Sequence, residues 1–244
     1  MPIIFIPNHP YQIYGLLIIL ALIIGEAYIY KRLRKLGALP KFALLFCLSS
    51  IIPIYIFSVL ANLILFQSIG LASAGAALGL IIWAIFFEFS YKNPKFLSIT
   101  GLPKIKLPKY SIITSSIFAL PLFYSIAKLA CLSASCCHGI DYHGPFAIKY
   151  EWLPGASFFP IQPLETVAFF LIFIAFSRIK NRSTAAYTTL LVCVVAKFFL
   201  DFLRYTHEGV FLSSNQIACI VAFISLLLLR IYLSKSKKIL SHRI

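Results

Sequence analysis

The sequence predicts an all-α polytopic membrane protein with seven transmembrane helices, its N-terminus outside and its C-terminus cytoplasmic. The first observation is composition, because 61% of the 244 residues are hydrophobic and 12% are charged. Soluble domains have about 45–50% apolar and about 25% charged residues. The mean hydropathy of +0.93 therefore excludes an ordinary soluble fold and a disordered chain. The second observation is that most basic residues lie in alternate connections between apolar segments.

Seven apolar segments match the roughly 20 residues that a helix needs to cross about 30 Å of hydrocarbon. In chain order they cover residues 12–30, 42–66, 69–90, 111–132, 165–179, 185–203 and 215–233. The fifth is short, although apolar residues before it can extend it. The first is expected to be a retained span, because residues 1–9 lack the basic stretch of a secretory signal. Residues 1–244 are thus predicted to form a single integral membrane domain, with a long outer loop at residues 133–164.

The basic residues predict the orientation. Of the 22 Lys and Arg residues, 18 lie near the end of, or after, the first, third, fifth or seventh apolar segment. Seven spans place all four of these positions on one side, and the positive-inside rule makes that side the cytoplasm. The net charge of +15 is then mainly a topology signal, so the sequence predicts a multi-pass membrane protein with no nucleic-acid partner.

Four basic residues fall outside this pattern: Lys128, Lys149, Lys197 and Arg204. An ionisable side chain at membrane depth is costly unless it is paired or faces water, so it marks a candidate functional site. Lys197, Asp201 and Arg204 are spaced at i, i+4 and i+7, which places them on one helix face. One interpretation is a structural Lys197–Asp201 ion pair. The other is that Arg204 holds a lipid phosphate through its guanidinium group.

Cysteine and histidine residues gather where the fourth apolar segment meets the outer loop. They are Cys131, Cys136, Cys137, His138 and His143. Cys/His clusters can bind zinc, but this spacing is not a repeated Cys-x-x-Cys pair, and no metal site is predicted. A disulfide from Cys131 to either of the later cysteines remains an open alternative.

The chain resembles the bacterial prolipoprotein diacylglyceryl transferases, seven-span enzymes of the inner membrane, over most of its length. The most specific part is residues 127–139, Ala-Lys-Leu-Ala-Cys-Leu-Ser-Ala-Ser-Cys-Cys-His-Gly, which is similar to the family's G-R-x-G-C-x-x-x-G-C-C-x-G. Residues 160–165 resemble H-P-x-Q-x-x-E, and residues 197–204 resemble R-F-x-x-E-F-x-R. Residues 212–216 resemble L-S-x-G-Q, and residues 13–15 resemble the W-Y-G that opens the first span.

The chain also departs from the family pattern. Residues 70–76 stand in the place of G-x-x-x-H-G-G, so that the family's histidine is Ala74 here. Two family arginines are Lys128 and Lys197, a glutamate is Asp201, and the arginine of the second span is Leu60. Lysine keeps the positive charge but loses the planar, bidentate guanidinium.

The resemblance implies that the thiol of a lipobox cysteine attacks a glycerol carbon of phosphatidylglycerol. The products are a thioether-linked diacylglyceryl group and glycerol phosphate. The implied partners are phosphatidylglycerol and prolipoprotein signal peptides, in the bacterial inner membrane, with no cofactor. The candidate catalytic residues are Arg204, Lys128, Glu165 and His138, the last as a replacement base. The candidate substrate-binding residues are Tyr14, Gln162, Lys197, Asp201, Gly75 and Gln216.

Two alternatives remain open at this point. One is a divergent relative that transfers a lipid group to another acceptor, which the missing histidine and the added Cys/His cluster favour. The other is a non-enzymatic lipid-binding or transport protein. Transporters often contain internal repeats and broken spans near the membrane midplane, whereas this sequence shows no convincing repeat and gathers its polar residues at one membrane boundary.

Overall fold

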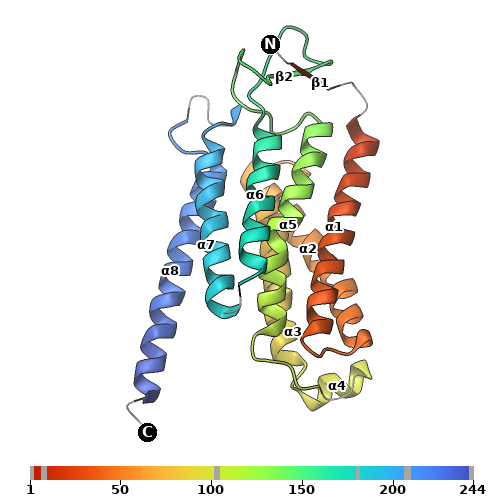
Figure 1. Cartoon of the computed structure of the whole chain (residues 1–244), viewed down its shortest axis with the longest axis vertical. Coiled ribbons are helices and arrows are strands. Elements are labelled where there is room, and N and C mark those ends of the chain that lie inside the picture. The colour runs from red at the N-terminus through yellow and green to blue at the C-terminus, as the bar shows by residue number, and fades with distance from the viewer. Residues whose placement is uncertain (1–2, 7–9, 102–104, 180–181, 206–209, 242–244) are drawn as a thin grey trace.

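The computed structural model describes residues 3–6, 10–101, 105–179, 182–205 and 210–241. It is an elongated helical bundle with a small two-stranded head at one end (Figure 1). The helices are α1 (Pro10–Lys35), α2 (Pro40–Phe66), α3 (Ser73–Ser90), α4 (Pro94–Thr100), α5 (Ser111–Ser133), α6 (Ile161–Ser177), α7 (Arg182–Asp201) and α8 (Ser214–Ser241). The strands are β1 (Ile4–Ile6) and β2 (Ile148–Tyr150).

The helices confirm the all-α, multi-pass prediction. Within the described residues, six helices are long and apolar enough to cross a membrane, and α6 is a shorter apolar helix of 17 residues. Each of the seven overlaps one predicted span. The fifth span begins earlier in the chain than the predicted residue 165, because α6 begins at Ile161. The predicted loop at 133–164 therefore ends four residues earlier, at Pro160.

The sequence did not predict α4. This helix has seven residues, begins with a proline, and is capped by the Asn93 side chain, which accepts a hydrogen bond of 3.0 Å from the Lys95 backbone N–H. It is too short to span a bilayer. It lies at the end of the bundle opposite the strands (Figure 1).

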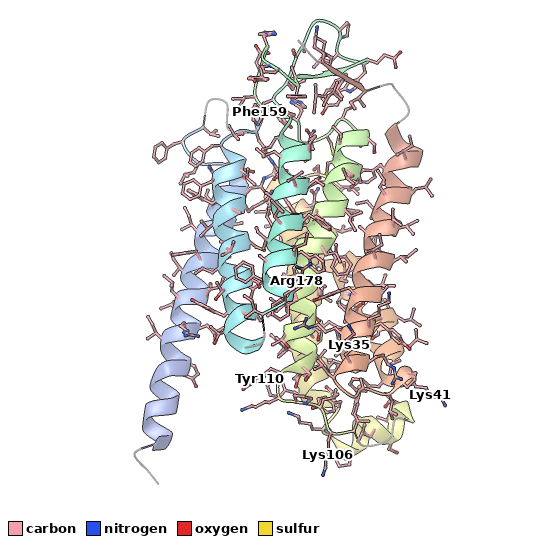
Figure 2. All side chains as sticks on the ribbon, in the orientation of Figure 1. Lys35, Lys41, Lys106, Tyr110, Phe159 and Arg178 are labelled. Carbon is pink, nitrogen blue, oxygen red and sulfur yellow. The ribbon has the colours of Figure 1, made fainter. Side chains whose placement is uncertain are left out.

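The basic connections lie at that same end. Lys35, Lys41 and Lys106 are found there, whereas Phe159 lies near the strands (Figure 2). We call the two ends of the bundle the basic end and the strand end. This separation agrees with the charge pattern, and the side of the membrane that each end faces stays a prediction.

The central helix of the bundle is α5. It contacts α1, α3, α6 and α7. In the most apolar stretch of α5, 61% of the residues are buried inside the protein, compared with 11% in that of α8. Its first turn is secured by Glu88 of α3, whose carboxylate accepts hydrogen bonds of 2.9 Å from the backbone N–H groups of Tyr110 and Ile112. This carboxylate satisfies donors that a helix N-terminus leaves unpaired, and it fixes α5 relative to α3.

Small residues allow α2 and α3 to pack closely. A Cβ atom added at Gly75 would overlap the backbone oxygen of Phe57, and one at Gly79 would overlap that of Pro53. Gly75 thus contacts α2, a packing role that small residues commonly serve between membrane helices.

Replacing Gly75 with valine is expected to lower the free energy of unfolding by about 1–3 kcal/mol, the usual cost of overpacking. Unfolding of the purified protein in mixed micelles, by titration with sodium dodecyl sulfate, measures this change. Gly15→Val is the matched control, because a Cβ at Gly15 meets nothing within 4 Å. Equal stabilities of the two variants would contradict the packing role.

The strand end is an ordered cap. β1 and β2 pair in parallel, with Ile4 opposite Ile148, and Ile148 exchanges two backbone hydrogen bonds of 2.9 Å with Phe158. The connection between α5 and α6 is held at the end of α7, since the Ile140 N–H donates to the Leu203 carbonyl at 3.1 Å. The connection between α5 and α6 therefore holds the ends of α5, α6 and α7 together.

Candidate functional site

A single buried carboxylate, that of Glu165, gathers three basic side chains at the strand end. Arg204 Nη2 donates to its two oxygens at 2.6 and 2.7 Å. Lys128 Nζ lies 3.1 Å from Oε2, and Lys197 Nζ lies 3.6 Å from Oε1. The Tyr124 hydroxyl donates to Oε1 at 2.8 Å. We call these five residues the charged cluster.

Three helices supply the charged cluster, and helical spacing explains how. Tyr124 and Lys128 are four residues apart on α5, Glu165 lies in the first turns of α6, and Lys197 is on α7. Arg204 follows the end of α7, where an antiparallel bridge to Gly139 holds its backbone. The structure therefore brings together four residues that the sequence singled out.

Tyr124 was missed by the sequence analysis. Its hydroxyl accepts a hydrogen bond of 2.7 Å from Lys197 and one of 3.3 Å from Arg204. Lys128 Nζ and Lys197 Nζ also lie 5.0 and 5.1 Å from the centre of its ring, within the range of cation–π contacts. Its position one turn before Lys128 was the available signal.

Asp201 joins the charged cluster to α8. Its Oδ1 lies 3.6 Å from Arg204 Nε and accepts from Asn215 Nδ2 at 3.3 Å, while the Ser213 hydroxyl donates to Oδ2. The proposed Lys197–Asp201 ion pair is thus not the pairing found. Lys197 reaches across to Glu165 and Tyr124, and Asp201 pairs with Arg204 instead.

The charges of this region do not cancel. Among the described side chains it holds three cations, Lys128, Lys197 and Arg204, and two carboxylates, Glu165 and Asp201. Glu165 and Asp201 are fully buried, and Arg204 is 3% exposed. A buried charge without a counter-charge is unfavourable. With one positive charge in excess, the region is suited to binding an anion such as a phosphate.

Gln162, a predicted substrate-binding residue, is fully buried beside the cap. Its Nε2 donates to the Cys136 carbonyl at 3.0 Å and to the Tyr150 hydroxyl at 2.9 Å. Its Oε1 is buried and has no hydrogen-bond partner within the described part of the chain. Burial raises the pKa of Tyr150 to about 12, so this hydroxyl stays neutral at physiological pH.

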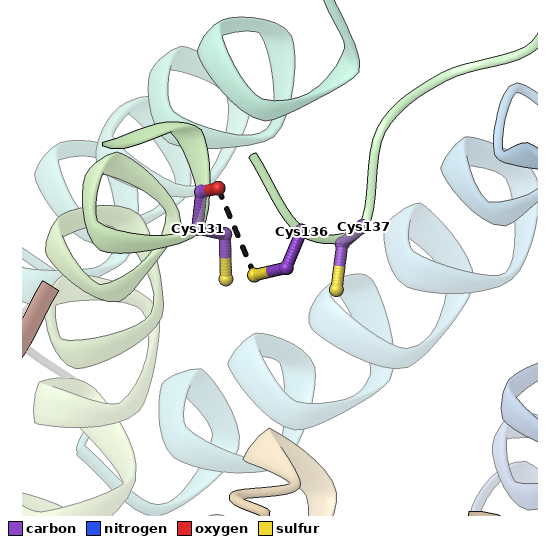
Figure 3. A group of neighbouring side chains, drawn as sticks. All are labelled: Cys131, Cys136 and Cys137. Atoms are coloured by element: carbon purple, nitrogen blue, oxygen red, sulfur yellow. Dashed lines mark hydrogen bonds between the residues drawn. The ribbon is translucent and has the colours of Figure 1, made fainter. Parts of the chain in front are cut away.

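Three cysteine thiols meet next to Gln162. The Sγ atoms of Cys131, Cys136 and Cys137 all lie within 4.8 Å of one another (Figure 3). All three cysteines are free, so the disulfide that the sequence left open is not formed. We call this group the thiol cluster.

The remaining predicted residues lie in different surroundings. Tyr14 lies near the start of α1, which packs against α5. The His138 ring stacks on Tyr205 and packs against Phe158, with centroid distances of 4.1 and 4.3 Å. Its described contacts lie in the cap and at Tyr205, after the end of α7, and do not include the charged cluster. The proposed role of His138 as a base stays a prediction.

Two predicted binding residues have structural contacts. Gly75 packs against α2, as described above. Gln216 closes the start of α8, because its Oε1 accepts from the Ser213 N–H at 3.0 Å and its own N–H donates to the Ser213 hydroxyl at 3.2 Å. Gln216 therefore supports the segment that holds Asp201, and neither residue contacts the charged cluster in the described structure.

Comparison with known proteins supports the resemblance that the motifs indicate. The family model of prolipoprotein diacylglyceryl transferase matches residues 2–232, nearly the whole chain. No curated protein gives a significant match. The match covers six of the seven apolar helices in full and α8 as far as residue 232, together with the charged cluster, the thiol cluster and the cap. The chain is a multi-pass membrane protein that belongs to the prolipoprotein diacylglyceryl transferase family.

Proposed function

We propose that this protein transfers the diacylglyceryl group of phosphatidylglycerol to the lipobox cysteine of prolipoproteins in the bacterial inner membrane. Membership of the family supports the reaction type. The observation that carries the choice of donor is the excess positive charge around Glu165, formed by Lys128, Lys197 and Arg204. Phosphatidylglycerol has a net charge of −1 and balances that excess, whereas the zwitterionic phosphatidylethanolamine does not.

Two carboxylates fix the orientation of the Arg204 guanidinium. Its Nη2 is held by Glu165, but its buried Nε has no hydrogen-bond partner among the described residues and lies 3.6 Å from Asp201. Glu165 and Asp201 thus hold the guanidinium in one orientation from two sides. A rigid, pre-oriented cation is the arrangement that stabilises developing charge most effectively.

The reaction needs that stabilisation at the leaving group. The acceptor sulfur forms a bond to the glyceryl carbon, the bond from this carbon to the phosphate oxygen breaks, and its electron pair leaves with glycerol phosphate. Negative charge on the phosphate therefore grows in the transition state. Arg204 and Lys128 are the cations assigned to it, with Lys197 and Asp201 as supporting groups.

The outer surface of α7 offers a place for the lipid tails. Leu191, Val192, Val195 and Ala196 form an apolar face of α7, immediately before Lys197 in the chain. An acyl chain lying there keeps its contact with the hydrocarbon of the bilayer, while the headgroup reaches the charged cluster.

Expression in cells depleted of their own transferase tests the proposal. We expect prolipoproteins to acquire the diacylglyceryl group, and mass spectrometry of a reporter lipoprotein measures it. In vesicles, the purified protein should modify a lipobox peptide when phosphatidylglycerol is present and not when phosphatidylethanolamine replaces it. Unmodified precursors, despite verified membrane insertion, would contradict the proposal.

A second candidate function is favoured by Ala74, which stands where the family has a histidine. A relative without that group could transfer the same lipid moiety to a different thiol. Lipid mass spectrometry of cells with and without the protein separates the two, because a small-molecule acceptor yields a lipid adduct that is not attached to protein.

A further inference from the structure

The thiol cluster has the dimensions of a zinc site. Zinc binds thiolate sulfur at about 2.3 Å in tetrahedral geometry, which places two ligand sulfurs about 3.8 Å apart. The three Sγ atoms already lie within 4.8 Å of one another (Figure 3). Small side-chain rotations therefore suffice to surround one ion.

The backbone holds these thiols together before any ion binds. Cys131 is in the last turns of α5, and the Cys136 N–H donates to its carbonyl at 3.1 Å. Ser135 and Cys137 have φ angles of 53° and 54°, a left-handed conformation that costs non-glycine residues energy. From α6, Gln162 holds the Cys136 carbonyl at 3.0 Å. Such strained turns persist where the surrounding structure enforces them, often at functional sites.

The cluster supplies three ligands and leaves a fourth position. Structural zinc sites have four protein ligands, whereas catalytic sites have three and an open position for water or substrate. Among the described residues, the metal-binding group contains Cys131, Cys136 and Cys137 alone. His138 is held in its aromatic stack instead. An external ligand can therefore complete the site.

The open site lies beside the charged cluster. Cys131 follows Lys128 by three residues on α5. Gln162, which binds the Cys136 carbonyl, precedes Glu165 by three residues on α6. A ligand on the metal would thus be held next to a phosphate bound by the cations of the charged cluster.

We propose that Cys131, Cys136 and Cys137 bind a zinc ion whose fourth position receives the thiol of the acceptor cysteine, an inference that rests on the proposed function. It departs from the sequence-based expectation of no metal. Zinc-bound thiols are deprotonated outright. The metal therefore generates the thiolate without a basic side chain at position 74, where this chain has Ala74.

The step balances without any change of oxidation state. The acceptor thiol binds zinc as a thiolate and its proton passes to water. The thiolate sulfur then attacks the glyceryl carbon, the bond from carbon to phosphate oxygen breaks, and the electron pair leaves with glycerol phosphate, which later takes up a proton. The thioether product is a weaker ligand than the thiolate, and it leaves the metal.

The first test is the zinc content of the purified, full-length protein in detergent, measured by inductively coupled plasma mass spectrometry. We expect about one zinc per chain, lost in Cys136→Ser and retained in Cys193→Ser, a cysteine of α7 outside the thiol cluster. Circular dichroism of both variants shows whether they remain folded. A metal-free wild-type protein, or one whose zinc survives loss of Cys136 in a folded chain, would overturn the proposal.

The second test uses cobalt(II) in place of zinc in the unaltered protein, without donor lipid. A lipobox peptide should increase the sulfur-to-cobalt charge-transfer absorption, because a fourth thiolate joins the metal, whereas the same peptide with serine should not. An unresponsive spectrum would overturn the open-site assignment. A responsive spectrum without diacylglyceryl transfer would leave the metal site standing and refute the proposed function, so the two failures are distinguishable.

Discussion

Arg204→Ala is expected to lower the rate of diacylglyceryl transfer by about 100-fold to 1,000-fold, the usual effect of removing one donor that stabilises transition-state charge. The substitution removes the guanidinium that binds Glu165 and lies beside Asp201. Two lysines then face two carboxylates, and no positive charge is left to balance the donor phosphate. The measurement is modification of a lipobox peptide in vesicles of phosphatidylglycerol.

Two further variants make this test specific. Arg204→Lys retains the charge but loses the planar guanidinium and its bidentate hydrogen bonds, so its transfer rate should fall between those of the wild type and Arg204→Ala. Arg178→Ala is the matched control, because Arg178 is exposed and caps the opposite end of α6 from Glu165. Equal losses in Arg178→Ala and Arg204→Ala would remove the basis for assigning the phosphate to the charged cluster.

Glu165→Gln is expected to destabilise the protein by about 3–5 kcal/mol, the cost of leaving buried charges unpaired. Glu165 is fully buried and contacts Lys128, Lys197 and Arg204. Without the charge of Glu165, Asp201 is the one carboxylate left to the three cations among the described side chains of this region. The mutual repulsion of the cations then opens the ends of α5, α6 and α7. Unfolding in mixed micelles measures the loss.

A second substitution separates charge from shape in this prediction. Glu165→Gln combined with Lys128→Met restores the original excess of one positive charge. We expect it to recover part of the lost stability but not the transfer activity. Full stability of Glu165→Gln alone would show that the ion pairs do not hold the helices together.

The helices could be predicted from sequence because their determinants are local. The apolar length of each segment fixes where a membrane helix can form, and the predicted spans overlap α1, α2, α3, α5, α6, α7 and α8. The start of α6 was misplaced because the Pro-containing run 160–163 reads as loop, although proline is tolerated in the first turn of a helix. α4 was missed because a seven-residue helix carries too little periodic signal.

The site was predictable only in part. The spacing of Lys197, Asp201 and Arg204 placed them on one face, and one interpretation of it was an ion pair between Lys197 and Asp201, which are neighbours on that face. The structure pairs Lys197 with Glu165, which is on another helix. Tyr124 lies in an apolar helix, and its one signal in the sequence was its position one turn before Lys128.

The sequence by itself determined the membrane helices, the separation of basic connections from a polar region, and the residues that carry charge at membrane depth. The tertiary structure decided that one carboxylate serves three cations and that three free thiols meet beside them. The physical reason is that helix formation depends on neighbours within a few residues. Pairing of buried charges depends on which helices pack together and on how the cap between α5 and α6 fixes their ends.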